Sequence, residues 1–118
     1  MKSDNEIKIF FNVLGNPNRW RLFDLLMTGV HCNCELSGLT GMANNLISHH
    51  LKILQDADLI HSERSTTDAR WIYYSVNQAK IKRIQEELQG FFDLSRISDR
   101  EPVCPPCKTK NEEKEQVL

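Results

Sequence analysis

The chain has 118 residues, 40% of them hydrophobic, which is enough for one compact domain with a modest core and too few for two domains. Its 15 Lys and Arg residues stand against 16 Asp and Glu residues, a net charge of −1, so any affinity for nucleic acid needs a local basic patch. No basic and apolar leader opens the sequence, and no apolar run approaches the roughly 18 residues that span a bilayer, so we expect a cytoplasmic protein without membrane contact.

The N-terminal part of the chain predicts two amphipathic helices. We expect Ser3 to cap the first, whose apolar residues follow the i, i+3, i+4, i+7 spacing up to Gly15. Asn16 and Pro17 then predict the cap and first residue of a second helix that runs to about Met27. The apolar stripe of the first helix consists of Ile7, Phe10, Phe11 and Leu14, of which Phe10 and Phe11 are expected at a dimer interface. The second helix is expected to bury Trp20, Phe23 and Leu26 or their neighbours.

The next segment predicts a short helix, a tight turn at Gly41 and a longer helix. The short helix should span about 33–40 with Asn33 as its cap, and the longer one about 43–57. On the longer helix His50 falls on the apolar face and is expected to be a core histidine, while polar residues fall on the opposite face. This arrangement is a helix-turn-helix, whose second helix enters the major groove of DNA. The side chains expected to contact DNA from this helix are Asn45, Ser48, His49 and Lys52.

The second half of the chain predicts a β-hairpin and a last helix. Strands are expected over residues 60–64 and 70–76, with Arg64 and Arg70 beside the tip, where they can reach DNA phosphates or the minor groove. After Asn77 a helix carries an apolar stripe through Phe91 and Phe92, too hydrophobic to stay in water.

These elements define the expected fold class, which is mainly α with a β-hairpin (α+β). We expect residues 1–95 to form a winged helix-turn-helix domain that pairs as a homodimer through its first and last helices. Residues 96–118 read as a polar, flexible tail.

Four cysteines form two short pairs, Cys32-x-Cys34 and Cys104-x-x-Cys107. In a reducing compartment such pairs act as ligands or redox groups rather than as structural disulfides. Residues two apart on a continuous helix point about 200° apart, so Cys32 and Cys34 can hold one ion only where a helix begins, and a helix N-terminus also favours the thiolate. Trivalent arsenic takes three thiolates, and zinc or cadmium four ligands, so Cys104 and Cys107, from the same or the partner subunit, could complete the site.

The order of these motifs resembles the ArsR/SmtB family of metal-sensing winged-helix repressors. The likeness spans about residues 5–95 and rests on Cys-Asn-Cys-Glu-Leu at 32–36, Leu-Ile-Ser-His-His-Leu-Lys-Ile-Leu at 46–54, Ala-Asp-Leu-Ile at 57–60 and Trp-Ile-Tyr-Tyr-Ser at 71–75. It implies a dimeric repressor, not an enzyme, that releases operator DNA on binding a metal or metalloid and so derepresses resistance genes.

Arsenic-sensing members carry Cys-Val-Cys at the start of the third helix, and the resemblance carries the ligand role over to Cys32 and Cys34. It favours As(III) as inducer, followed by Cd(II), Pb(II) or Zn(II). The tail pair, Cys104 and Cys107, departs from the arsenic pattern. Residues 78–95 contain no histidine, which argues against a histidine-rich zinc site on the last helix.

Three alternatives remain open from the sequence. One is a DNA-binding thiol redox sensor, in which Cys104 and Cys107 or a core and a tail cysteine form a disulfide. Another is a small thiol oxidoreductase that uses the tail pair, although the βαβ setting typical of such a motif is missing. The third is a purely structural zinc ion held by all four cysteines.

Overall fold

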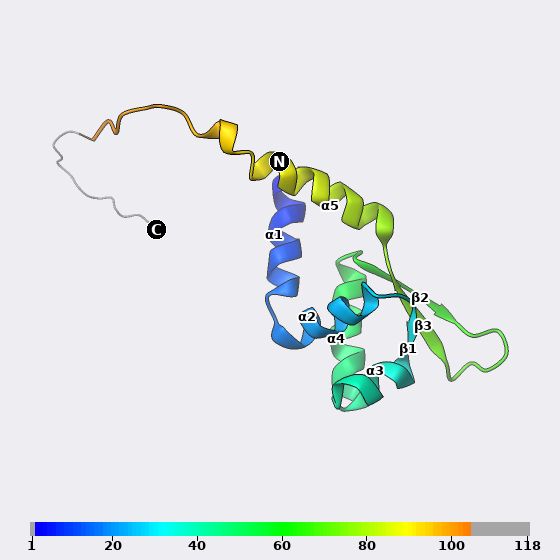
Figure 1. The fold of residues 1–118 in the computed structure, drawn as a ribbon. Helices are drawn as coiled ribbons and strands as arrows, with labels where there is room; N and C mark the ends of the chain where they lie inside the picture. The colour runs from blue at the N-terminus through cyan, green and yellow to red at the C-terminus, as the bar shows by residue number, and fades with distance from the viewer. Residues whose placement is uncertain (1, 105–118) are drawn as a thin grey trace.

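Five α-helices, three strands and one short 3-10 helix form the part of the chain that the computed structural model describes, which is residues 2–104, with side chains from residue 5 (Figure 1). Their order matches the expected winged helix-turn-helix, so the predicted fold class is confirmed. The elements are α1 (Lys2–Leu14), α2 (Pro17–Leu26), β1 (His31–Cys32), α3 (Asn33–Thr40), α4 (Asn44–Asp56), β2 (Ile60–Arg64), β3 (Ile72–Val76), α5 (Gln78–Phe91) and η1 (Leu94–Arg96).

Two helices start at capping asparagines, Asn16 and Asn77, whereas the start of α1 departs from prediction. The Asn16 side chain accepts hydrogen bonds from the backbone N–H groups of Asn18 (2.9 Å) and Arg19 (3.2 Å), with Pro17 at the first helical position. Asn77 caps α5 in the same way. Ser3 is not a cap, since the backbone is already helical at Lys2. A helix at a chain start can satisfy its first N–H groups with water, so no capping residue has to mark it.

The core is built from one face of each helix and from the sheet. Of the residues expected to be buried on α2, Phe23 and Leu26 are buried, but Trp20 is 58% exposed and Leu22 is buried in its place. Residue 20 lies two positions before Leu22, about 200° around the helix, so both cannot face the core. The largest fully buried side chains are Leu22, Leu36, Leu51, Leu54, Leu59 and Ile84.

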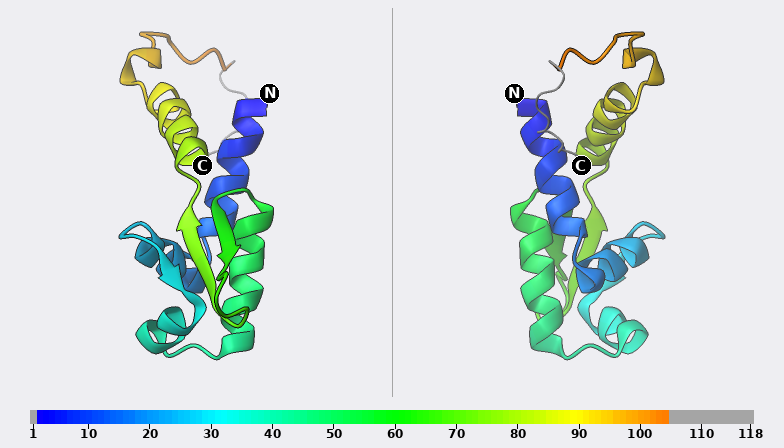
Figure 2. Two further views of the ribbon diagram at one scale, coloured as in Figure 1. Left: turned by 90° about the vertical axis from the view of Figure 1, so that its right-hand side faces the viewer. Right: turned by 90° about the vertical axis from the view of Figure 1, so that its left-hand side faces the viewer.

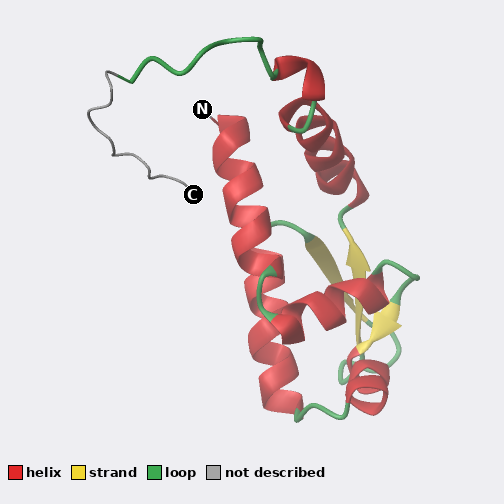
Figure 3. Cartoon of the chain, turned by 60° about the vertical axis from the view of Figure 1, so that its left-hand side comes forward, coloured by secondary structure: helices red, strands yellow, loops and turns green. Residues whose placement is uncertain are grey.

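The sheet has one strand more than the predicted hairpin. β2 and β3 pair antiparallel from Ile60 opposite Val76 to Arg64 opposite Ile72, which confirms the wing. β1 adds to the other side of β3, with Cys32 opposite Tyr73, and gives the order β1-β3-β2 (Figure 3). A strand of two residues has no alternation to read, so the sequence did not predict it.

The helix-turn-helix is formed by α3 and α4. Gly41 ends α3 in the left-handed region (φ 73°) and donates its N–H to the Ser37 carbonyl at 2.9 Å. Two residues later Ala43 is the N-cap residue of α4, which begins at Asn44 and runs along the sheet (Figure 2). Both helices therefore match their predicted extents, and the turn fixes the angle at which α4 presents its outer face.

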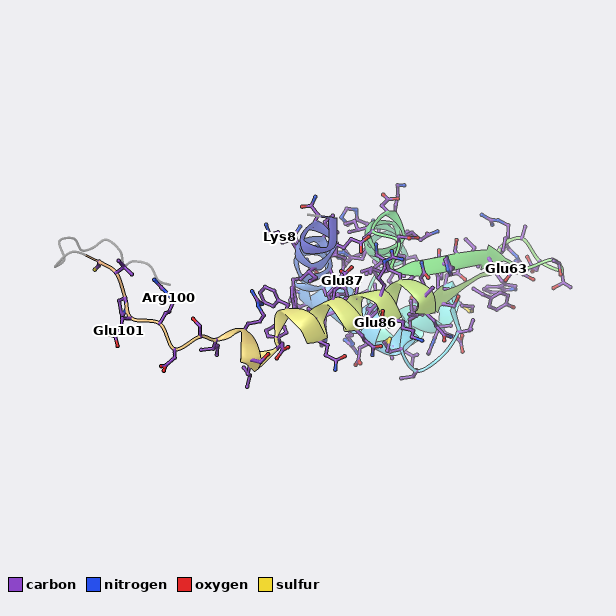
Figure 4. The ribbon with its side chains drawn as sticks, turned by 90° about the horizontal axis from the view of Figure 1, so that it is seen from above. Lys8, Glu63, Glu86, Glu87, Arg100 and Glu101 are labelled. Carbon is purple, nitrogen blue, oxygen red and sulfur yellow. The ribbon has the colours of Figure 1, made fainter. Side chains whose placement is uncertain are left out.

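The two terminal helices contact each other, and α5 leads out of the domain. Glu6 on α1 pairs with Lys80 (3.5 Å) and Arg83 (3.4 Å) on α5. Beyond η1 the chain is extended, and the segment that carries Arg100 and Glu101 runs away from the helices and the hairpin (Figure 4). Within residues 2–104, no helix combines the length and the apolar character needed to cross a membrane.

His50 makes a prediction about stability. It is buried on the inner face of α4, as expected, with Nδ1 3.4 Å from the Arg19 guanidinium. Burial, followed by the charges of Arg19 and His49, holds the pKa of His50 below its ordinary value. The unfolded chain, with a histidine pKa of about 6.5, therefore binds more protons than the folded protein just below that pH, and the free energy of unfolding falls as the pH drops through this range.

Urea denaturation between pH 7.5 and 5.5, at fixed protein concentration, should show this fall in wild type and a flatter profile in His50→Gln. The exposed wing histidine supplies the control, and His61→Gln should keep the wild-type slope. An unchanged slope in His50→Gln would contradict the assignment.

Candidate metal site and nucleic-acid interface

Cys32 and Cys34 lie at the start of α3, and their sulfur atoms are 2.7 Å apart. Cys32 is the N-cap residue with extended backbone (φ −90°, ψ 161°), so the predicted cap, Asn33, is instead the first helical residue. Glu35 completes a capping box, because its carboxylate accepts the Cys32 backbone N–H at 2.8 Å. The cap falls on Cys32 because β1 holds that residue extended, and this extended position allows two side chains of a C-x-C pair to meet.

The two thiols have opposite electrostatic character. Burial raises the pKa of the Cys32 thiol, but hydrogen bonds from Cys34 and from the backbone N–H groups of Glu35 and Cys34 outweigh it and leave the pKa lowered. The pKa of Cys34 is raised, chiefly by its hydrogen bond to Cys32 and then by burial. Cys32 is therefore the more readily ionised thiol of the pair, in line with the expected effect of a helix N-terminus.

This pair suits a soft ion only in part. Two thiolates on one tetrahedral zinc ion lie ~3.8 Å apart, given Zn–S bonds of about 2.3 Å, so the sulfurs must separate by about 1 Å to share a metal. Among residues 5–104, no cluster of three or more His, Cys, Asp or Glu side chains has the geometry of a metal site. Cys32 and Cys34 thus form a two-sulfur half-site.

The structure does not bring Cys104 to this half-site. Cys104 is exposed in the extended segment that leaves α5 at the end of the molecule opposite α3 (Figures 1 and 2). Cys107 lies outside the described residues. His31 is also engaged elsewhere, since its Nδ1 lies 2.8 Å from the Gly29 carbonyl oxygen.

A cavity of about 350 Å³ connects the half-site to the second helix of the helix-turn-helix. Cys34 and Ser37 line it from α3, Asn44 and Ser48 line it from the first turns of α4, and Trp71 lines it from the wing. Cys34 is the exposed member of the pair, so an ion held there has α4 as its near neighbour. The sequence singled out Ser48 but not Asn44, which begins α4.

The outer face of α4 carries the residues predicted to read DNA. Asn45, Ser48, His49 and Lys52 are all exposed, whereas Ile47, His50, Leu51 and Leu54 are buried. Lys52 forms an i, i+4 ion pair with Asp56 at 3.6 Å. The face is therefore polar with little net charge.

The wing carries the other two predicted DNA contacts. Arg70 pairs with Asp68 at 2.7 Å, and its guanidinium lies over the Trp71 ring at 5.7 Å. The hydrogen bonds from Arg70 hold the pKa of the Asp68 carboxyl below its ordinary value. Arg64 donates to the Ala69 carbonyl and is exposed. Both arginines thus flank the hairpin tip, with Arg70 already paired to an acid.

One contact that the sequence analysis missed joins α3 to the wing. The Asn33 side chain donates to the Arg70 carbonyl and accepts from the Ile72 backbone N–H, each at 3.4 Å. The only signal for this contact in the sequence is that a polar residue, Asn33, lies between the two cysteines.

Comparisons with known proteins agree with this geometry. Residues 16–62 match the family described as "Bacterial regulatory protein, arsR family". The chain is 32% identical over 78 residues to an arsenical resistance operon repressor of Bacillus subtilis (strain 168), which covers 65% of this chain and 71% of the relative. A repressor of the same name from Staphylococcus xylosus is 27% identical over 107 residues, covering 91% of this chain and 96% of the relative.

A solved structure shares the fold. The ArsR-like transcriptional regulator from Rhodococcus sp. RHA1 superimposes with a TM-score of 0.70 at 20% identity and covers 81% of this chain and 88% of its own.

Proposed function

This chain belongs to the arsR family of bacterial regulatory proteins. We propose that it is a transcriptional repressor that dissociates from operator DNA when it binds a thiophilic metal or metalloid. As(III) is the favoured inducer, followed by Cd(II), Pb(II) or Zn(II), and release derepresses resistance genes. The family consists of regulators, so the thiol oxidoreductase alternative is dropped.

The observation that carries this proposal is the position of the sulfur pair. Cys32 and Cys34 meet at 2.7 Å, and Cys34 lines a cavity whose other wall is the start of α4. An ion that spreads the sulfurs therefore pushes on the helix that presents Asn45, Ser48 and His49. Coupling of this kind is typically worth about 1–3 kcal/mol, which lowers DNA affinity about 5- to 150-fold, provided that the ion binds better to the form that does not bind DNA.

The remaining ligands belong to the same proposal. Cys104 and Cys107 supply the third and fourth sulfurs, and the direction of segment 97–104 favours donation to a partner subunit over donation within one chain. Thiolates then satisfy As(III) with three sulfurs or a divalent ion with four. The domain that holds Cys32 and Cys34 covers residues 1–95, and the tail serves as a ligand arm.

Titration of arsenite into the reduced protein bound to DNA from immediately upstream of its coding region tests the function. Fluorescence anisotropy should show release at near-stoichiometric arsenite in wild type. Cys32→Ser should bind the same DNA with unchanged affinity and should not be released, because the half-site keeps one sulfur.

Cys104→Ser is the companion variant and should need more arsenite for release. Normal release of Cys32→Ser would refute the site, and release by peroxide under chelation, reversed by dithiothreitol, would favour the redox alternative.

The DNA-reading face of α4 makes a second prediction. Ser48→Ala and His49→Ala each remove a polar group that is exposed on this face, and each should weaken binding by about 1–3 kcal/mol with unchanged metal stoichiometry. Gln55→Ala, exposed on the same helix but hydrogen-bonded to Ser62 of the wing, serves as the control. Unchanged affinity in both variants would move the DNA-reading surface elsewhere.

The terminal helices make a third prediction, on assembly. Phe11, Phe91 and Phe92 are 49–61% exposed, and Leu94 and Ile97 continue this apolar surface, which suits a homodimer interface. Phe91→Glu should shift the protein toward monomer in light scattering and weaken DNA binding. Leu39→Glu changes an equally exposed residue on α3 (53%) and should leave the oligomeric state unchanged, and a dimeric Phe91→Glu would count against this interface.

A further inference from the structure

Asn33 gives the half-site a side-chain contact with the wing, in addition to the backbone pairing of Cys32 with Tyr73. It lies between Cys32 and Cys34, at the first position of α3, and its amide bridges the Arg70 carbonyl and the Ile72 N–H. One side chain thus holds the backbone on both sides of Trp71. The partners are 37 and 39 residues away in sequence, so the contact extends the connection between α3 and the wing beyond the two residues of the β1–β3 ladder, as far as the base of the hairpin tip.

The segment that Asn33 holds sets the geometry of the wing. The Trp71 carbonyl accepts from the Ser65 N–H at 2.8 Å, and the Trp71 N–H donates to the Asp68 carbonyl at 3.0 Å, which together close the hairpin tip. The Arg70 side chain is fixed between Asp68 and the Trp71 ring. A shift of the backbone at residues 70–72 therefore moves both the tip and Arg70.

We propose that Asn33 is a positioning residue that couples occupancy of the Cys32–Cys34 site to the position of the wing. This inference rests on the proposed function and adds a second route, since the cavity beside Cys34 leads to α4 whereas Asn33 leads to the hairpin.

The effect of an ion on the Asn33 contacts depends on which cysteine of the half-site is held in place. Cys32 is held by the β1–β3 ladder opposite Tyr73, so it cannot move without the sheet. Cys34 is exposed, so a separation of the two sulfurs moves Cys34, the residue that follows Asn33 in the first turn of α3. Both amide contacts, at 3.4 Å, lie beyond the usual 2.7–3.2 Å for N–H···O bonds, so a shift of a few tenths of an ångström breaks or tightens them.

The chemistry of the side chain is specific to this role. An amide offers an NH2 donor and a carbonyl acceptor in one plane, which matches the Arg70 carbonyl and the Ile72 N–H on either side of Trp71. The valine that the arsenic-sensing pattern has between its cysteines can make neither contact. The route through Asn33 is therefore a feature of this chain rather than of the pattern that it resembles.

The test compares wild type with Asn33→Ala in two measurements on the full-length protein. In the metal-free protein, amide hydrogen exchange at Ile72 should be faster in the variant, while exchange at Glu35 in α3 stays unchanged. In the second, the ratio of DNA dissociation constants with and without arsenite should fall about three- to tenfold, with unchanged arsenite stoichiometry.

Two further variants keep the result interpretable. Gly38→Ala lies on the same helix, where an added Cβ meets nothing within 4 Å, and should retain the wild-type ratio. Asn33→Asp is isosteric, is favoured in a first helical turn and keeps the acceptor for Ile72, so it should fold and give an intermediate ratio. Equal ratios in wild type, Asn33→Ala and Asn33→Asp would overturn the coupling alone. Failure of arsenite, cadmium, lead and zinc to release wild type would overturn the proposed function and the coupling with it.

Discussion

The junction of β1 and α3 at Cys32 is the constraint on which the rest of the site depends. Cys32 ends a strand that pairs with the wing and caps the first helix of the helix-turn-helix, so one residue belongs to both structural units. The extended backbone of a cap turns its sulfur toward the helix N–H groups and toward Cys34. A chelating pair at another point of a helix would have its side chains on different faces and no direct connection to the sheet.

The same junction explains how a small ligand could act on a larger surface. The helix end holds two acidic groups, the Cys32 thiol with its lowered pKa and the Glu35 carboxylate. The charge of Glu35 opposes ionisation of the thiol, whereas the Glu35 backbone N–H favours it. A cation bound by the sulfurs relieves that repulsion and draws Cys34 away from its hydrogen bond. Both changes fall on the first turn of α3, where Asn33 contacts the wing and Cys34 faces α4.

Much of the fold follows from local signals, and the failures have physical reasons. Asn16 with Pro17, Gly41 and Asn77 mark helix ends by chemistry that acts within a few residues, and apolar spacing identifies α4 and its buried His50. β1 is too short to show a residue pattern. Because this strand was not predicted, the helix cap was expected at Asn33 instead of Cys32. The Asn33 bridge spans 37 residues or more, and such a contact is set by tertiary packing that no local rule encodes.

The charges on the predicted DNA surface lead to a further step. Lys52 is paired with Asp56, Arg70 is paired with Asp68, and the chain as a whole carries −1, so few cations on this surface are available to phosphate. Under the proposed function, non-specific affinity, which depends on phosphate neutralisation, is then low, and binding relies on polar contacts of α4 with base edges, doubled in the proposed homodimer. In a complex of that kind, few ionic contacts to phosphate remain to hold the protein on DNA once α4 or the wing is displaced. Modest coupling at Cys32 and Cys34 can then suffice for release.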